Sequence, residues 1–287
     1  MGILTKIERV ARQLRMFLIV AVALSSAAVP SAAAESPLYS YGKACKKALP
    51  FYRQGWAEIL EKGRWTEAER LYREAVAVAP DCVIAKSVLG RITVDAAERK
   101  SLITQIQASM ENVDPHGRLI LEPYLKTLIL ISARDTAQSL SEDFRGDLTK
   151  AAISNYQIFL EHYPEEWAVR VEYIEWIHAE QGPQMALEAI QKMSQERPGD
   201  GARFSYFPAY FHAELGAYEQ ATELARQFVQ GLGPGDWPQE HYINAFIAYQ
   251  LGDYSAASQS VKQALVLDPR HLIAERLSKK IDAAMAP

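Results

Sequence analysis

The sequence predicts an all-α protein built from repeated two-helix hairpins. Three observations lead to this expectation: prolines recur at a nearly constant interval, apolar residues recur every three or four positions, and one pattern of glycine, aromatic residue and alanine returns along the chain. With 287 residues, of which 49% are apolar and 23% charged, the chain has the composition of a globular protein with a sizeable core.

Prolines that close helical segments give the repeat its period. They are separated by 35, 49, 34, 36 and 35 residues, so four of the five intervals are close to the length of one helical hairpin. About six such units fit the chain. The prolines are Pro80, Pro115, Pro164, Pro198, Pro234 and Pro269.

The apolar pattern within a unit is helical. Trp65, Ala68, Leu71, Tyr72 and Ala75 follow one another at three- and four-residue steps, which places them along one face of a helix. A hairpin with one such face cannot cover it alone, so each unit is expected to stack on its neighbours.

The clearest units share a glycine, an aromatic residue, spaced alanines and a closing proline. Glycine suits the left-handed turn that ends one helix, and small alanines let neighbouring helices approach closely. The matching positions are Gly63, Trp65, Ala68, Ala75 and Pro80 in one unit, Gly252, Tyr254, Ala257, Ala264 and Pro269 in another, and Gly216, Tyr218 and Ala221 in a third. Over roughly residues 49–270 the period and these residues together resemble the tetratricopeptide-repeat family, in an exported, bacterial-type member.

This resemblance implies a right-handed superhelical solenoid of about six stacked hairpins. We expect a lead-in segment over residues 35–48 and a C-terminal capping helix over 271–287, whose Arg276, Lys279 and Lys280 are spaced to face water. In the long third interval we expect a first helix over Leu119–Ile131, with Pro123 near its start, and a second helix from about Leu148. Between them an enlarged turn at 134–147 has room for a short helix. It is either a tolerated surface loop or part of a binding site.

The amino terminus has the three regions of a secretory signal peptide over residues 1–34. A basic segment precedes the apolar run Met16–Leu24, and the small residues Ala32 to Ala34 precede Glu35. We expect cleavage after Ala34 and a periplasmic or secreted protein without membrane insertion; the alternative is an uncleaved anchor. The remaining 27 basic and 34 acidic residues give a net charge of −7, which argues against nucleic acid or an anionic membrane as partner.

Export also bears on the two cysteines, Cys45 and Cys82. An oxidising compartment favours a disulfide between them. Each precedes the start of a hairpin, and in stacked hairpins those points are neighbours. The alternative is a pair of unpaired thiols buried as small apolar side chains.

No pattern in the sequence points to catalysis or to a cofactor. The six histidines are scattered over different units, and no two have the four-residue spacing of a zinc-protease pair, so each is expected to be a helix-surface or core residue. The alternative is a metal site that adjacent helices would form from His178, His212 and Glu175. We therefore expect a non-catalytic scaffold or adaptor of the cell envelope that binds a peptide or protein partner in the concave groove. The alternatives are an enzyme or enzyme-accessory subunit with a helical-repeat body, and a structural subunit that binds through its convex face.

The resemblance also implies where a partner binds, because first helices line the concave surface in this family. Five aromatic residues on two adjacent first helices form the expected wall, and four charged or polar residues lie beside it. If the rings instead pack between helices, they belong to the core. The expected groove residues are Tyr206, Tyr210, Tyr242, Phe246, Tyr249, Arg203, Glu172, Glu175 and His178.

Overall fold

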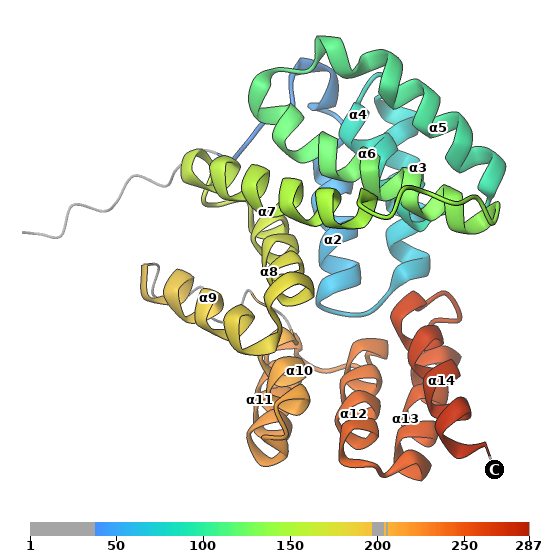
Figure 1. Ribbon diagram of the computed structural model, residues 1–287, viewed down its shortest axis with the longest axis vertical. Helices are drawn as coiled ribbons and strands as arrows, with labels where there is room; N and C mark the ends of the chain where they lie inside the picture. Colours follow the sequence, from blue (N-terminus) through green and yellow to red (C-terminus); the bar gives the residue numbers. More distant parts are fainter. Residues whose placement is uncertain (1–37, 197–203, 205, 287) are drawn as a thin grey trace, which may run out of the picture. The chain divides into compact units, whose positions relative to one another are not determined.

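The computed structural model describes residues 38–196, 204 and 206–286. Within these ranges all regular elements are helices: two short 3-10 helices and thirteen α-helices, labelled α2 to α14 (Figure 1). The predicted all-α fold is confirmed. The expected signal peptide falls in residues 1–37, outside the described part of the chain.

The α-helices follow one another as six pairs and a last single helix. We call the two members of each pair the first and second helix. The pairs are α2 (Leu49–Leu60) with α3 (Trp65–Val78), α4 (Val83–Ile92) with α5 (Ala96–Ser109), α6 (Pro115–Asp135) with α7 (Phe144–His162), α8 (Trp167–Gln181) with α9 (Pro183–Glu196), α10 (Phe207–Glu214) with α11 (Tyr218–Leu232), and α12 (Pro238–Leu251) with α13 (Tyr254–Leu267), followed by α14 (Leu272–Met285).

The glycines and alanines of the repeat end helices and allow close helix packing, as the sequence predicts. Gly252 ends α12 in the left-handed conformation, with φ 84° and ψ 4°, and the Asp253 side chain then caps α13 by accepting from the Ala256 N–H at 3.0 Å. Ala68 and Ala75 are fully buried. The Tyr72 ring of α3 lies so close to Gly55 of α2 that no Cβ would fit there. Small residues therefore set the close packing of this hairpin.

The third hairpin differs from the expectation. Asp114 caps α6 by accepting from the N–H groups of His116 and Gly117, and Pro115 occupies the first turn, so α6 begins before Leu119. Pro123 consequently lies inside the helix. Because α6 runs on to Asp135 and α7 begins at Phe144, the turn between them spans 136–143 and holds no helix. The insertion lengthens two helices more than it enlarges a loop.

The lead-in segment packs against the third and fourth hairpins. The Tyr39 N–H donates to the Glu166 carboxylate at 2.7 Å, and its ring contacts Phe159 and Tyr163 with centroids 5.3 Å and 4.8 Å away. Arg53 of α2 donates to the same carboxylate at 2.9 Å. Glu166 thus joins the start of the described chain to the turn before α8.

The last hairpin and α14 contact the first hairpin directly. The Thr66 N–H and hydroxyl donate to the Asp268 carboxylate at 2.9 Å and 2.7 Å, and the Gln239 N–H donates to the Lys62 carbonyl at 3.1 Å. Arg270 forms an ion pair with Glu69 and donates to the Ile92 carbonyl at 2.9 Å. We had expected α14 to be a water-facing end cap. Arg276, Lys279 and Lys280 are exposed, as expected, but the N-terminal end of α14 is packed against the first hairpin.

None of the helices in the described ranges is long and apolar enough to cross a membrane.

Candidate functional site

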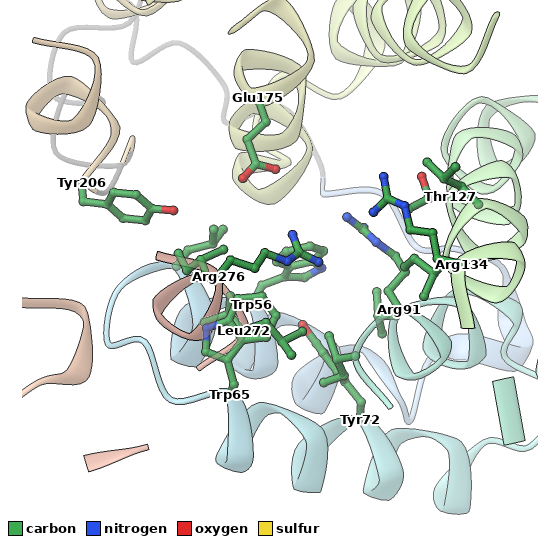
Figure 2. Close-up of a pocket in the computed structure, with 17 residues that line it drawn as sticks. Trp56, Trp65, Tyr72, Arg91, Thr127, Arg134, Glu175, Tyr206, Leu272 and Arg276 are labelled. Atoms are coloured by element: carbon green, nitrogen blue, oxygen red, sulfur yellow. The ribbon is translucent and has the colours of Figure 1, made fainter. Parts of the chain in front are cut away.

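The first helices meet around a cavity of about 260 Å³ (Figure 2). Four of them contribute to its wall: α2, α4, α6 and α8. The second helix α3, Tyr206 at the start of α10, and α14 complete it. Aromatic and aliphatic side chains dominate the lining, and the charged side chains in it are three arginines and one glutamate. The charged residues are Arg91, Arg134, Arg276 and Glu175.

Arg91 is the arginine whose charge is balanced within the wall. It forms an ion pair with Glu172 of α8, which is 1% exposed and also accepts a hydrogen bond from the Tyr124 hydroxyl. The Arg91 guanidinium lies 4.5 Å from the Tyr124 ring and 5.4 Å from the Trp56 ring. A buried pair held in this way is costly to break, because either partner left alone is an uncompensated buried charge.

Arg134 and Arg276 have no such partner. No carboxylate in the described ranges lies within ion-pair distance of either guanidinium. Burial lowers the pKa of Arg134, and the positive charges of Arg145 and Arg276 lower it further. Both guanidinium groups point into the space between the lining helices (Figure 2). Both side chains line the cavity and are also exposed to solvent, and neither has an ion-pair partner among the described residues.

Glu175 lies opposite these arginines. Its side chain is exposed and lines the cavity, and neighbouring protein atoms crowd the carboxyl group. This burial raises the pKa of Glu175 to about 7, the neighbouring Glu172 raises it too, and Arg91 lowers it. Near neutral pH Glu175 is therefore protonated in a large fraction of molecules, and its carboxyl group can then donate a hydrogen bond.

Three neutral donors of the lining residues are unused. The Tyr72 hydroxyl and the indole N–H groups of Trp56 and Trp65 have no hydrogen-bond partner in the part of the chain that the structure describes. Tyr72 is 1% exposed and Trp56 is 7% exposed. These three atoms have almost no accessible surface, so neighbouring protein atoms cover them and they are not presented to the cavity.

The expected aromatic wall is for the most part core. Tyr206, Tyr242 and Phe246 are buried. The Tyr206 and Tyr242 rings lie 5.7 Å apart, and Tyr210 stacks on Phe246 at 3.8 Å. This corrects the expectation of an open wall, since rings on adjacent first helices fill the space between α10 and α12. Glu172 is likewise corrected, because it is buried in its ion pair.

Some of the expected groove residues keep accessible surface. Tyr210 and Tyr249 are half-buried, and His178 is half-buried with its Nε2 2.6 Å from the Glu214 carboxylate. The His178 ring lies 5.8 Å from the Tyr210 ring, which links α8 to α10. Glu175 and Tyr206 line the cavity. Arg203 lies outside the described residues.

Two further expectations concern sulfur and metal chemistry. Cys45 and Cys82 are joined by a disulfide with a Cα–Cα distance of 4.6 Å, between the short 3-10 helix Lys43–Cys45 and the start of α4. Among the described residues, no group of three histidine, cysteine or acidic side chains could hold a metal ion.

The sequence analysis did not place Arg91, Arg134 and Arg276 at one cavity, and it assigned Arg276 only to the water-facing side of the capping helix. A signal was present, because each follows the apolar stripe of its helix at a three- or four-residue step. Arg91 follows Val88, Arg134 follows Leu130 and Ile131, and Arg276 follows Leu272 and Ile273. A charged residue in register with an apolar face is uncommon unless it has a partner or a role. Because the three arginines are far apart in the sequence, their spacing did not indicate that they line the same cavity.

Comparison with known proteins identifies part of this architecture. A family model described as tetratricopeptide repeat matches residues 58–96, from the end of α2 through α3 and α4 to the first residue of α5. The match falls on the unit with the clearest glycine, aromatic and alanine pattern. No curated protein matches the chain.

Proposed function

We propose that this chain is a non-catalytic scaffold of the cell envelope that holds a segment of a protein partner against its first helices, because residues 58–96 match a tetratricopeptide-repeat model and the described helices pair as such repeats do. Repeats of this family generally mediate interactions between proteins.

One observation supports the first helices as the binding surface. Consecutive first helices α8, α10 and α12 carry half-buried rings, His178, Tyr210 and Tyr249, whose positions are fixed by their neighbours. Tyr210 rests on Phe246, and His178 is held by Glu214. Rings that are already immobilised lose little conformational entropy on binding and bury a large area, which is why aromatic residues dominate binding hot spots.

The test is partner capture with matched tyrosine variants of the full exported protein. Tyr210→Ala combined with Tyr249→Ala is expected to reduce recovery of partners from the native envelope at least about tenfold, because hot-spot rings contribute about 2 kcal/mol or more. Tyr173→Ala is the control. Tyr173 is a half-buried tyrosine of α8 that lies among Ala189 and Met193 of the second helix α9. All variants must keep the wild-type melting temperature within a few degrees.

Unchanged capture by the double variant would contradict the proposed surface. Loss of capture with Tyr173→Ala instead would move the partner to the side of the second helices, as the convex-face alternative requires. The envelope location has its own measurement, the intact mass of protein recovered after export. Removal of residues 1–34 is expected, and a full-length mass in the membrane fraction would contradict it.

A further inference from the structure

We propose that the cavity between the first helices and α14 is a binding site for a small organic anion that carries one carboxylate on an apolar body. This proposal concerns a small molecule. It stands on the cavity alone and is independent of any protein partner.

The site is assembled from distant parts of the chain. Trp56 of α2, Arg134 of α6 and Arg276 of α14 line one space, although 220 residues separate the first from the last. Its volume of about 260 Å³ is close to the lower end of ligand pockets, about 300 Å³. An apolar wall with a few convergent polar groups is typical of small-molecule sites rather than of packing defects.

The charges select an anion. The positive charge of Arg91 is balanced by Glu172, whereas Arg134 and Arg276 line the cavity, are also exposed to solvent, and have no ion-pair partner among the described residues (Figure 2). A guanidinium presents two parallel N–H groups that match the two oxygens of a carboxylate. A cation would be repelled by both groups.

The nearby Glu175 favours a ligand with a single negative charge. It is part of the lining, so whenever it is ionised it repels a second negative charge placed near it. A protonated Glu175 can also donate to the bound carboxylate, and this donor is lost as the pH rises through about 7. Binding is therefore expected to weaken between pH 6 and pH 8.

The rest of the wall selects an apolar body. Trp56, Trp65, Leu130, Ile131, Leu272 and Ile273 form the apolar part of the lining. An alkyl or aryl group would bind more favourably by transferring its apolar surface from water to this lining. A small inorganic anion has no apolar surface to transfer.

The experiment titrates the mature protein with octanoate, followed by calorimetry and by the fluorescence of the tryptophans. Octanamide has the same body without the charge, and acetate has the charge without the body. Octanoate is expected to bind and the two controls to bind at least about tenfold more weakly. Arg134→Gln and Arg276→Gln should each weaken octanoate binding roughly 10- to 100-fold, because each removes a charge-assisted hydrogen bond.

The matched control variant is Arg145→Gln. Arg145 is exposed and its charge acts on Arg134, but it does not line the cavity, so octanoate affinity should change less than about threefold. Thermal melting of each variant without ligand checks that it is folded. Equal binding of octanoate and octanamide, undiminished binding by both arginine variants, or no octanoate binding at millimolar concentration would each overturn the proposal. Loss of partner capture has no bearing on these outcomes.

Discussion

His271 is the buried titratable side chain at the contact between the first and last hairpins. It is 0% exposed, its Nδ1 accepts from the Ala274 N–H at 3.2 Å at the start of α14, and its Nε2 has no partner among the described residues. Burial lowers the pKa of His271 to about 4, although the nearby Asp268 raises it. The folded protein therefore holds this ring neutral.

This burial predicts an acid-sensitive stability. In the unfolded chain His271 takes up a proton below its ordinary pKa of about 6.5, whereas the folded protein does so only near 4. The unfolded state binds more protons between these values. The free energy of unfolding should accordingly fall as the pH drops from about 6.5 to 4, by up to about 3 kcal/mol from this group.

Urea unfolding at pH 4.5, 5.5 and 7.5 measures the effect. His271→Asn is the control, since asparagine can still cap α14 but does not titrate. The variant should lose stability less steeply with falling pH than the wild type, whatever its stability at pH 7.5. Parallel pH profiles for the two proteins would mean that His271 is not the responsible group.

At the scale of elements, the sequence predicted most of the fold because helix boundaries are local. Gly252 and Asp253 mark a helix end and a helix start within two residues, and the structure has both. The exception was α6, where Asp114 and Pro115 together start the helix earlier than its apolar run indicates. The capping residue, rather than the apolar pattern, therefore determines where α6 begins.

The candidate site was less predictable than the helices. Spacing shows which side of a helix carries a residue, but it does not show what covers that side. Tyr206 and Tyr242 have the spacing of groove residues, and each is buried by rings of the neighbouring first helix. Arg91, Arg134 and Arg276 meet because α4, α6 and α14 converge, which depends on long-range contacts that no local pattern encodes.

The disulfide joins the lead-in segment to the start of α4. It closes a chain segment in which Cys45 and Cys82 are 37 positions apart, and the chain-entropy model gives about 4 kcal/mol for a loop of this length. Alkylation of the unreduced, denatured protein is expected to modify neither cysteine, as mass spectrometry would show. Cys45→Ser combined with Cys82→Ser should lower the free energy of unfolding by roughly 2–4 kcal/mol.

The alkylation and unfolding experiments test the bond and its contribution to stability separately. Labelling of both cysteines without reduction would contradict the bond itself. An intact bond whose removal costs less than about 1 kcal/mol would instead mean that the lead-in segment is held by other contacts, above all those of Tyr39 with Glu166, Phe159 and Tyr163.

At the scale of the whole described array, the repeat pattern does not predict that the first hairpin contacts the last hairpin and α14. In a linear array each unit touches only its neighbours, and stability is a sum of local terms. Here Asp268 accepts from Thr66, and Arg270 reaches Glu69 and the Ile92 carbonyl. The same contact brings Leu272 and Arg276 to the cavity wall opposite Trp56. Closure of the ends thus couples the stability of the first hairpin to the proposed ligand site.

Gly63 offers the sharpest test of this closure. It has φ +71°, and a Cβ atom there would lie 2.7 Å from both the Gln239 backbone nitrogen and the His271 Nε2. Gly216 has a similar φ of +77°, but a Cβ there would meet no described atom within 4 Å. Gly216→Ala should therefore cost only the strain of a left-handed alanine, about 1–2 kcal/mol. Gly63→Ala should cost roughly 1–3 kcal/mol more, because it also pushes the last hairpin away. Urea unfolding of both variants measures the difference, and octanoate affinity should fall only in Gly63→Ala. Equal costs for the two substitutions would show that the ends of the array do not bear on each other in solution.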